Sequence, residues 1–403
     1  MPNNTAITLN SPYFTQATRQ VIPNRRLVNE RYNWSKDEEL KTIEEVRDFL
    51  RKQRGAMDPR DEVRTLSRCK VTFNAKGVPF IQFIDARGRL IPEIYHFTKR
   101  GWTALVKEVF PAGLRDQLAM ARTPGAGAKI ATLALNIFLA QQDREVLFRT
   151  ARTKTDVVVD GRSIVNRMIR TVQKSSDIGY TPMDNLEVVE SLLSTDCGNA
   201  RVLEMMIEDE AFALRLALVD NDEMKMDIDN QYPMIQVRNC EVGLGSVRIG
   251  GGTIRPWCAN GCFSTERTSE IRRPHRGSHE RISAAVNNSF SDIVAGAYGV
   301  VEKYQEALEV EVDDLVALME EEYENMAKAY SGFALNETEK DLIVAALEDE
   351  TTHDPGLLAA GVDAITFAAK ALPLNRQNDL EKIAFEFMAR SLERAEERKI
   401  ILA

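Results

Sequence analysis

The sequence has few of the residues on which most catalytic and metal sites depend. It contains four histidines and five cysteines among 403 residues. Four histidines leave few candidates for acid–base catalysis, and five cysteines in so long a chain do not make a disulfide framework. The hydrolase and metalloprotease motifs G-x-S-x-G and H-E-x-x-H are missing too. We therefore expect neither an enzyme nor a bound cofactor.

Long apolar stretches are also missing. No run approaches the roughly 18 residues that a membrane-spanning helix needs. The first ten residues lack the basic and then apolar pattern of a secretion signal, so we expect a protein of the reducing cytoplasm. The hydrophobic content of 44% and the charged content of 28% are typical of a globular protein. A chain of 403 residues predicts two or three packed units.

Positive charge is scarce overall and concentrated locally. The net charge of −9 argues against a protein that coats nucleic acid along its whole surface. Residues 301–350 hold sixteen Asp or Glu and three Lys, whereas residues 19–31 hold four Arg and one Glu. The acidic stretch fits a solvated helical face or a surface that repels nucleic acid. A local basic site therefore stays possible.

The hydrophobic pattern predicts an α+β protein with a central antiparallel β-sheet, flanking helices and a helical C-terminal region. We divide the chain into an N-terminal arm at 1–36, an α+β core at 37–300 and an acidic helical region at 301–403. Helices are expected at 37–54, in most of 98–152, at 183–193, 200–207 and 282–395. Strands are expected at 69–73, 78–84, 157–159, 211–220, 234–238, 246–249 and 253–258, and 164–174 fits a strand or a helix. The three glycines at 250–252 are expected to form a turn between strands.

Residues 255–281 form one dense cluster of cysteine, histidine and arginine. Its Cys and His residues have the spacing C-x3-C-x12-H-x3-H of a zinc site: Cys258, Cys262, His275 and His279. The stretch between the second Cys and the first His offers only Phe263 and Ile271 as apolar groups. Pro274 also opposes a helix that would carry both histidines. We therefore favour a site without metal, with Cys258 buried in a strand and His275 hydrogen-bonded in a loop.

The arginines of this cluster suit phosphate, because a guanidinium group presents a fork of donors that matches phosphate oxygens. Arg255 and Trp257 fall on one face of a predicted strand, where the indole ring is available to stack on an unpaired base. The alternatives are salt bridges to the acidic helices for the arginines and a core position for the tryptophan. The residues predicted to contact nucleic acid are Arg25, Arg26, Arg255, Trp257, Arg267, Arg272, Arg273, His275, Arg276 and Arg281.

Four stretches of the chain resemble a known family. They are SDIGYTPMDN (176–185), RNCEVGLGS (238–246), CANG (258–261) and RRPHRG (272–277), in this order. They are similar to the phage and plasmid-like proteins grouped as domain of unknown function 932, over about residues 60–300 and more weakly over 362–387. The resemblance implies a bacteriophage or mobile-element origin, and hence the cytoplasm of an infected bacterium. It supplies no activity. Since Cys262 and His279 fall where the family shows no fixed ligand, the resemblance also argues against zinc.

Together these features predict a bacteriophage protein that binds nucleic acid through its sheet and its arginine-rich loop. Single-stranded DNA is favoured over duplex, because no recognition helix or basic coiled-coil region is present to enter a major groove. The protein would be an accessory of phage recombination, replication or transcription, with proteins of those processes as partners and with possible homo-oligomerisation. The alternative is an oligomeric phage assembly protein, in which the acidic helices and the N-terminal arm bind protein and no nucleic acid is involved.

Overall fold

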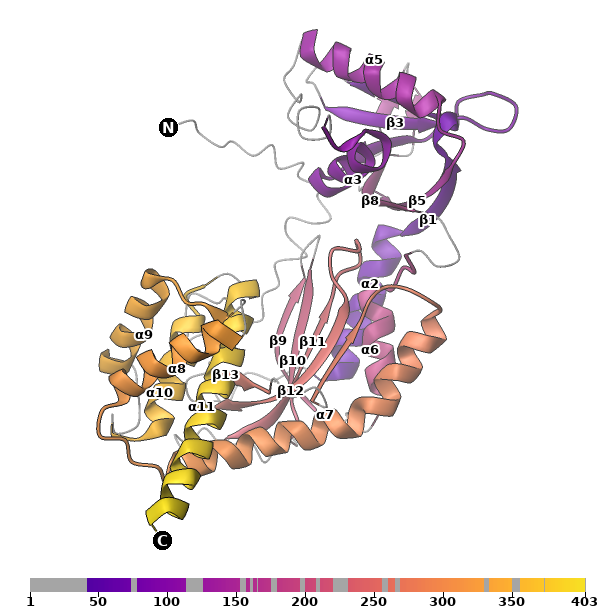
Figure 1. The fold of residues 1–403 in the computed structure, drawn as a ribbon. Helices are drawn as coiled ribbons and strands as arrows, with labels where there is room; N and C mark the ends of the chain where they lie inside the picture. The colour runs from indigo at the N-terminus through magenta and orange to yellow at the C-terminus, as the bar shows by residue number, and fades with distance from the viewer. Residues whose placement is uncertain are drawn as a thin grey trace.

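A computed structural model gives the structure of the chain (Figure 1). It describes residues 42–73, 78–113, 126–152, 157–159, 162–164, 166–174, 180–195, 200–207, 211–219, 231–255, 260–264, 269–329, 333–349, 356–372 and 374–402. In these residues the chain forms two six-stranded sheets, a small two-stranded sheet and a helical C-terminal region. The predicted α+β class and the predicted helical C-terminal region are therefore confirmed.

The first sheet has the strand order β1-β5-β8-β4-β3-β2. The strands are β1 (Arg60–Thr65), β5 (Glu145–Arg152), β8 (Asn166–Lys174), β4 (Ile94–Phe97), β3 (Pro79–Phe83) and β2 (Cys69–Phe73). Neighbouring strands are antiparallel except β4 and β8, which are parallel. Helices α3 (Lys99–Val109) and α5 (Ala126–Ala140) contribute to the core of this sheet, where the ring of Trp102 packs edge-on against Phe97 of β4.

Strand β5 corrects the expectation of a helix through residue 152. Its six central residues, 146–151, are all buried. A strand that is covered on both faces lacks the alternation of apolar and polar residues by which a strand is normally recognised. The segment 164–174, which fitted either a strand or a helix, contains strand β8, which pairs with β5. The small sheet pairs β6 (Val157–Val159) with β7 (Arg162–Ile164), as the strand prediction at 157–159 requires.

The second sheet is antiparallel, with the order β13-β12-β11-β10-β9, and β14 pairs with β12 beside β13. Its strands are β9 (Arg201–Ile207), β10 (Phe212–Ala217), β11 (Tyr232–Asn239), β12 (Val247–Arg255), β13 (Asn260–Phe263) and β14 (Glu270–Arg273). Residues 201–207 thus form a strand, and the helix expected at 200–207 is wrong. Their apolar residues, interrupted only by Glu204, fit the period of a helix as well as that of a strand, and pairing with β10 decides for the strand.

One face of the second sheet is covered by α2 (Ile43–Met57), α6 (Asn185–Leu193) and α7 (His279–Ala307). Helix α2 begins after Thr42, whose hydroxyl accepts from the Glu45 backbone while the Glu45 carboxylate accepts from Thr42, which makes a capping box. The start that we expected near Ser35 lies outside the described residues. The other face of the sheet meets α11 (Leu374–Leu402) through β13 (Figure 1).

The glycines at 250–252 lie inside β12 and not in a turn, contrary to our expectation. A Cβ atom added at Gly251 would lie 2.4 Å from the carbonyl oxygen of Ile293 in α7. A Cβ atom added at Gly252 would lie 2.3 Å from the carbonyl oxygen of Cys262 in β13. The glycines therefore let a helix and a neighbouring strand approach the sheet closely, which is a recognised use of glycine within strands.

The C-terminal region consists of α8 (Leu315–Ala329), α9 (Glu337–Asp349), α10 (Leu358–Ala369) and α11 in the described residues. These helices share a hydrophobic core with the end of α7 and with Cys262 of β13. In the part of the chain that the structure describes, no helix is long and apolar enough to cross a membrane.

Candidate functional site

The structure divides the residues predicted to contact nucleic acid into two groups. Outside the described residues lie Arg25, Arg26, Trp257, Arg267 and the side chain of Arg255. On β14, in the turn after it and in the first turn of α7 lie Arg272, Arg273, His275, Arg276 and Arg281. The four arginines of the second group are exposed, and none of them forms an ion pair with a carboxylate of a described residue. Salt bridges to the acidic helices therefore do not account for these four.

The residues with zinc-ligand spacing lie in different surroundings. Cys262 is buried, and desolvation raises the pKa of its thiol. His275 is 4% exposed, with its ring centroid 5.4 Å from that of Tyr180. His279 Nδ1 lies 3.5 Å from the Glu187 carboxylate, and Cys258 lies outside the described residues. Among the residues described, no three His, Cys, Asp or Glu side chains come together as a metal site.

Three arginines line up across neighbouring strands of the second sheet. Strand register places Arg272 of β14 opposite Arg248 of β12, and Arg248 opposite Arg238 of β11. We call these residues the arginine row. Because neighbouring strands lie about 4.8 Å apart, the row spans roughly 10 Å of backbone. It joins one predicted residue, Arg272, to two that our sequence analysis did not select.

Two members of the arginine row are held close together without a compensating charge. The Nε atoms of Arg248 and Arg272 donate to the same Ser246 hydroxyl, at 3.4 and 3.3 Å. Neither guanidinium forms an ion pair with a carboxylate of a described residue. Like charges that stand directly opposite each other destabilise a sheet. An arrangement with this cost favours an anionic ligand that neutralises it.

The arginine row borders an open groove between the sheet and α11. The groove has a volume of about 570 Å³, and Arg238 and Arg248 line it together with Ser246, Asn378 and Lys382. We call it the arginine groove. Its acidic lining residues already have partners: Glu270 lies 2.6 Å from Lys382, and Asp379 lies 3.6 Å from Arg376. Among the lining residues, Arg248 thus presents a positive charge to a ligand, and Arg272 of the arginine row lies beside it.

A buried ion pair fixes α11 beside this groove. The Arg215 guanidinium donates to both carboxylate oxygens of Glu381 at 2.8 Å, and the two side chains are 2% and 1% exposed. Gln377 adds a hydrogen bond of 2.7 Å to the same carboxylate. A Cβ atom added at Gly261 would lie 3.5 Å from both Arg215 and Glu381. Close packing here sets the distance between the sheet and the helix, and thereby the width of the arginine groove.

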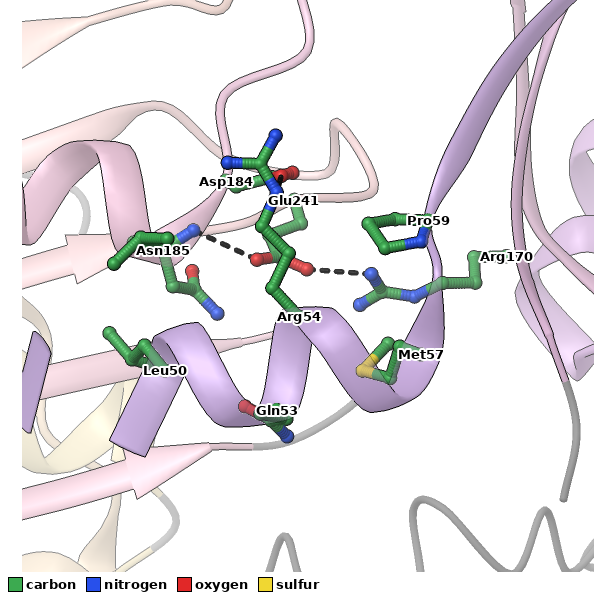
Figure 2. A pocket seen from close by; sticks show the side chains of 10 residues that line it. Leu50, Gln53, Arg54, Met57, Pro59, Arg170, Asp184, Asn185 and Glu241 are labelled. Carbon is green, nitrogen blue, oxygen red and sulfur yellow. Dashed lines mark hydrogen bonds and ion pairs between the residues drawn. The ribbon is translucent and has the colours of Figure 1, made fainter. Parts of the chain in front are cut away.

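A second charged cluster joins the two sheets. Figure 2 shows Glu241 between Arg170 of the first sheet and Asn185 at the start of α6. The Glu241 carboxylate accepts from Arg170 Nη1 at 2.6 Å and from the Asn185 backbone amide at 2.8 Å. Desolvation opposes ionisation, but Arg170 and Arg149 outweigh it and hold the pKa of Glu241 below its usual range. Arg149 is 2% exposed and pairs with Asp184.

The cavity beside this cluster, drawn in Figure 2, has a volume of about 30 Å³. That volume suits about one water molecule and excludes an organic ligand. Arg54 of α2 closes its side through an ion pair of 3.2 Å with Asp184. We therefore interpret the cluster as a junction that joins the two sheets, and the arginine groove as the candidate site.

Three of the family-like stretches meet at this junction. The Thr181 amide donates to the His275 carbonyl at 2.8 Å, and Asn239 Nδ2 donates to the Met183 carbonyl at 3.0 Å. Burial and the nearby Arg149 lower the pKa of His275 to about 4. A buried, neutral imidazole does not contact nucleic acid from this position, so we assign His275 to the junction and not to the site.

Comparisons of the chain with family models, curated proteins and solved structures found no match. The resemblance to domain of unknown function 932 stays a prediction.

Sequence reasoning missed Arg238 and Arg248 because neither lies in the arginine-rich stretch at 255–281. A signal was present: both follow a buried residue, Val237 and Val247, in strands joined by a glycine-containing turn. Pairing those two strands from the sequence would have placed the arginines side by side. The position of α11, which forms the other wall, had no comparable signal.

Proposed function

We propose that the protein binds single-stranded nucleic acid, and single-stranded DNA above all, in the arginine groove. The observation that supports this proposal most strongly is the arginine row. In it, Arg248 and Arg272 face each other on paired strands, and neither has a carboxylate partner among the described residues. Guanidinium groups bind phosphate oxygens with two parallel hydrogen bonds, which suits a phosphate backbone that crosses the strands.

The form of the groove supports a single strand over a duplex. Its walls are the face of a sheet and the side of α11. Duplex readers place a helix or a β-ribbon in the major groove. An extended strand needs only a basic channel, and its affinity falls with salt as bound phosphates release counterions.

The biological setting belongs to the same proposal. The phage-like stretches support a role as an accessory of phage recombination, replication or transcription in the cytoplasm of an infected bacterium. In that role the groove would hold the single strands that these processes expose. Three further exposed arginines follow Arg272 in the sequence and add positive charge near the arginine row: Arg273, Arg276 and Arg281.

Fluorescence anisotropy with labelled single-stranded DNA, duplex DNA and RNA tests this function. We expect the protein to bind single-stranded DNA at low salt more tightly than the duplex. The variant R248Q/R272Q should lose at least about tenfold in affinity, or 1.4 kcal/mol, because two charged contacts to phosphate are removed.

The matched control is R68Q/R87Q, which removes two exposed arginines from the first sheet and its turns. It lowers the net charge by the same amount and should leave the affinity unchanged. No binding at low salt, or the same loss of affinity in both double variants, would sink the proposal.

A further inference from the structure

A second groove lies in the C-terminal helical region, remote in sequence from the arginine row. It has a volume of about 450 Å³ and is formed by the connection between α7 and α8, the first turns of α8, the start of α10 and the C-terminal half of α11. Its floor is apolar, with Val310, Val312, Leu318 and Leu358. The connection is held in place by backbone hydrogen bonds from Val312 to Gly356, 2.7 Å, and from Leu358 to Val310, 2.9 Å. The groove is thus a fixed surface.

The rim of this groove is acidic. It carries five carboxylates, from Glu309, Glu311, Asp313, Asp314 and Glu321. Two of them already have partners within the fold. Asp314 accepts a hydrogen bond from the Ala317 amide at 3.0 Å, and Glu321 forms an ion pair of 2.8 Å with Arg394. The other three are exposed and form no ion pair within the described residues. We call this surface the acidic groove.

A buried hydroxyl without a partner faces the same surface. Ser391 of α11 lines the groove and is 5% exposed, and its Oγ has no hydrogen-bond partner among the described residues. A buried polar atom left unsatisfied destabilises a fold, and a helical serine normally avoids this by bonding to the carbonyl one turn earlier. The unsatisfied hydroxyl marks a position where a backbone amide or carbonyl of a bound peptide would fit.

We infer that the acidic groove binds the basic N-terminal segment of the same molecule, residues 19–31. This segment carries four arginines and one acidic residue, together with the apolar Val21, Ile22, Leu27 and Val28. Arginines match the unpaired rim carboxylates, apolar side chains match the floor, and the peptide backbone matches the Ser391 hydroxyl. The inference does not depend on the proposed nucleic-acid function.

A linker of ten residues joins the basic segment to the folded part of the chain. Residues 32–41 separate the basic segment from Thr42, which is fixed by a bridge to Arg201 of β9. Ten extended residues span up to about 35 Å, which is about the diameter of a small domain. This linker lets the basic segment extend well away from α2.

Limited trypsin digestion of the full chain tests the inference, because trypsin cuts after Arg25 and Arg26. We expect slow cleavage at these two bonds at low salt and fast cleavage at high salt. In the variant E311Q/D313N cleavage should be roughly five-fold faster than in the wild type, since two exposed ion pairs are lost. The variant S391A should also speed cleavage, without a loss of thermal stability.

The control variant D341N/E348Q removes two exposed carboxylates from α9, outside the groove, and should cleave at the wild-type rate. Cleavage should not depend on protein concentration, because the segment binds its own molecule. Equal rates in the wild type, E311Q/D313N and S391A would overturn the inference. So would protection that disappears on dilution, because the segment would then belong to a second copy.

Discussion

The arginine row leads to a prediction that distinguishes a binding site from an ordinary surface: removal of one of its charges should make the protein more stable. Arg248 and Arg272 stand opposite each other, and both Nε atoms reach the Ser246 hydroxyl. The two Nε atoms are therefore no more than roughly 7 Å apart. Replacement of either arginine by glutamine removes the repulsion and keeps a polar side chain at the position.

The expected gain follows from Coulomb's law. Two unit charges about 7 Å apart in water repel by about 0.6 kcal/mol, which lies within the roughly 0.2–1 kcal/mol measured for cross-strand pairs. R248Q and R272Q should each raise the free energy of unfolding by about this amount. The double variant should gain less than the sum of the two single variants, because the repulsion between Arg248 and Arg272 is already gone after one replacement.

Urea denaturation of the wild type, both single variants and the double variant measures the coupling between the two residues. At low salt we expect an unfavourable coupling of about 0.6 kcal/mol. At 1 M salt, where the screening length is about 3 Å, it should fall close to zero. A favourable coupling, or an absence of coupling at low salt, would refute the side-by-side placement of the two guanidinium groups.

Three other predictions concern the packing around the groove and the junction. Glu381→Gln should lower the free energy of unfolding by about 3–5 kcal/mol, because it leaves the buried Arg215 charge unpaired; R215M/E381L should recover much of this loss in chemical denaturation. Gly251→Ala should lower stability by about 1–3 kcal/mol, because its Cβ atom would lie 2.4 Å from Ile293 O, whereas Gly55→Ala, with nothing within 4 Å, should not. Because the pKa of His275 is about 4 in the folded protein, the unfolded chain binds a proton at this residue between about pH 4 and 6.5 and the folded protein does not. Stability should therefore be full above about pH 6.5 and fall by up to about 3 kcal/mol as the pH drops toward 4, and His275→Phe should flatten this part of the stability curve.

The elements that the sequence predicted well are those with one buried face. The strands at 69–73 and 79–83 and the helix at 185–193 alternate or repeat as a half-buried element must, and all were found. Strands β5 and β9 were predicted as helices. Their apolar residues carry no alternation, so the local pattern does not contain the information that decides between the two structures.

The candidate site was only partly predictable, for a different reason. Arg272 was selected because it lies in a dense run of arginines. Arg238 and Arg248 join it through strand register, which is a long-range property that depends on the turn between β11 and β12 and on the pairing of β14. The Arg215–Glu381 pair, which fixes α11, joins residues 166 positions apart, and no local pattern marks either partner.

The central claim, that the arginine row binds the phosphates of a single strand, is tested most directly by the salt dependence of binding. For single strands, the slope of log K against log salt concentration is about −0.7 for each phosphate neutralised. We predict that R248Q/R272Q reduces the magnitude of the wild-type slope by about 1.4, and that R68Q/R87Q leaves the slope unchanged. Equal slopes for the wild type and R248Q/R272Q would contradict the claim.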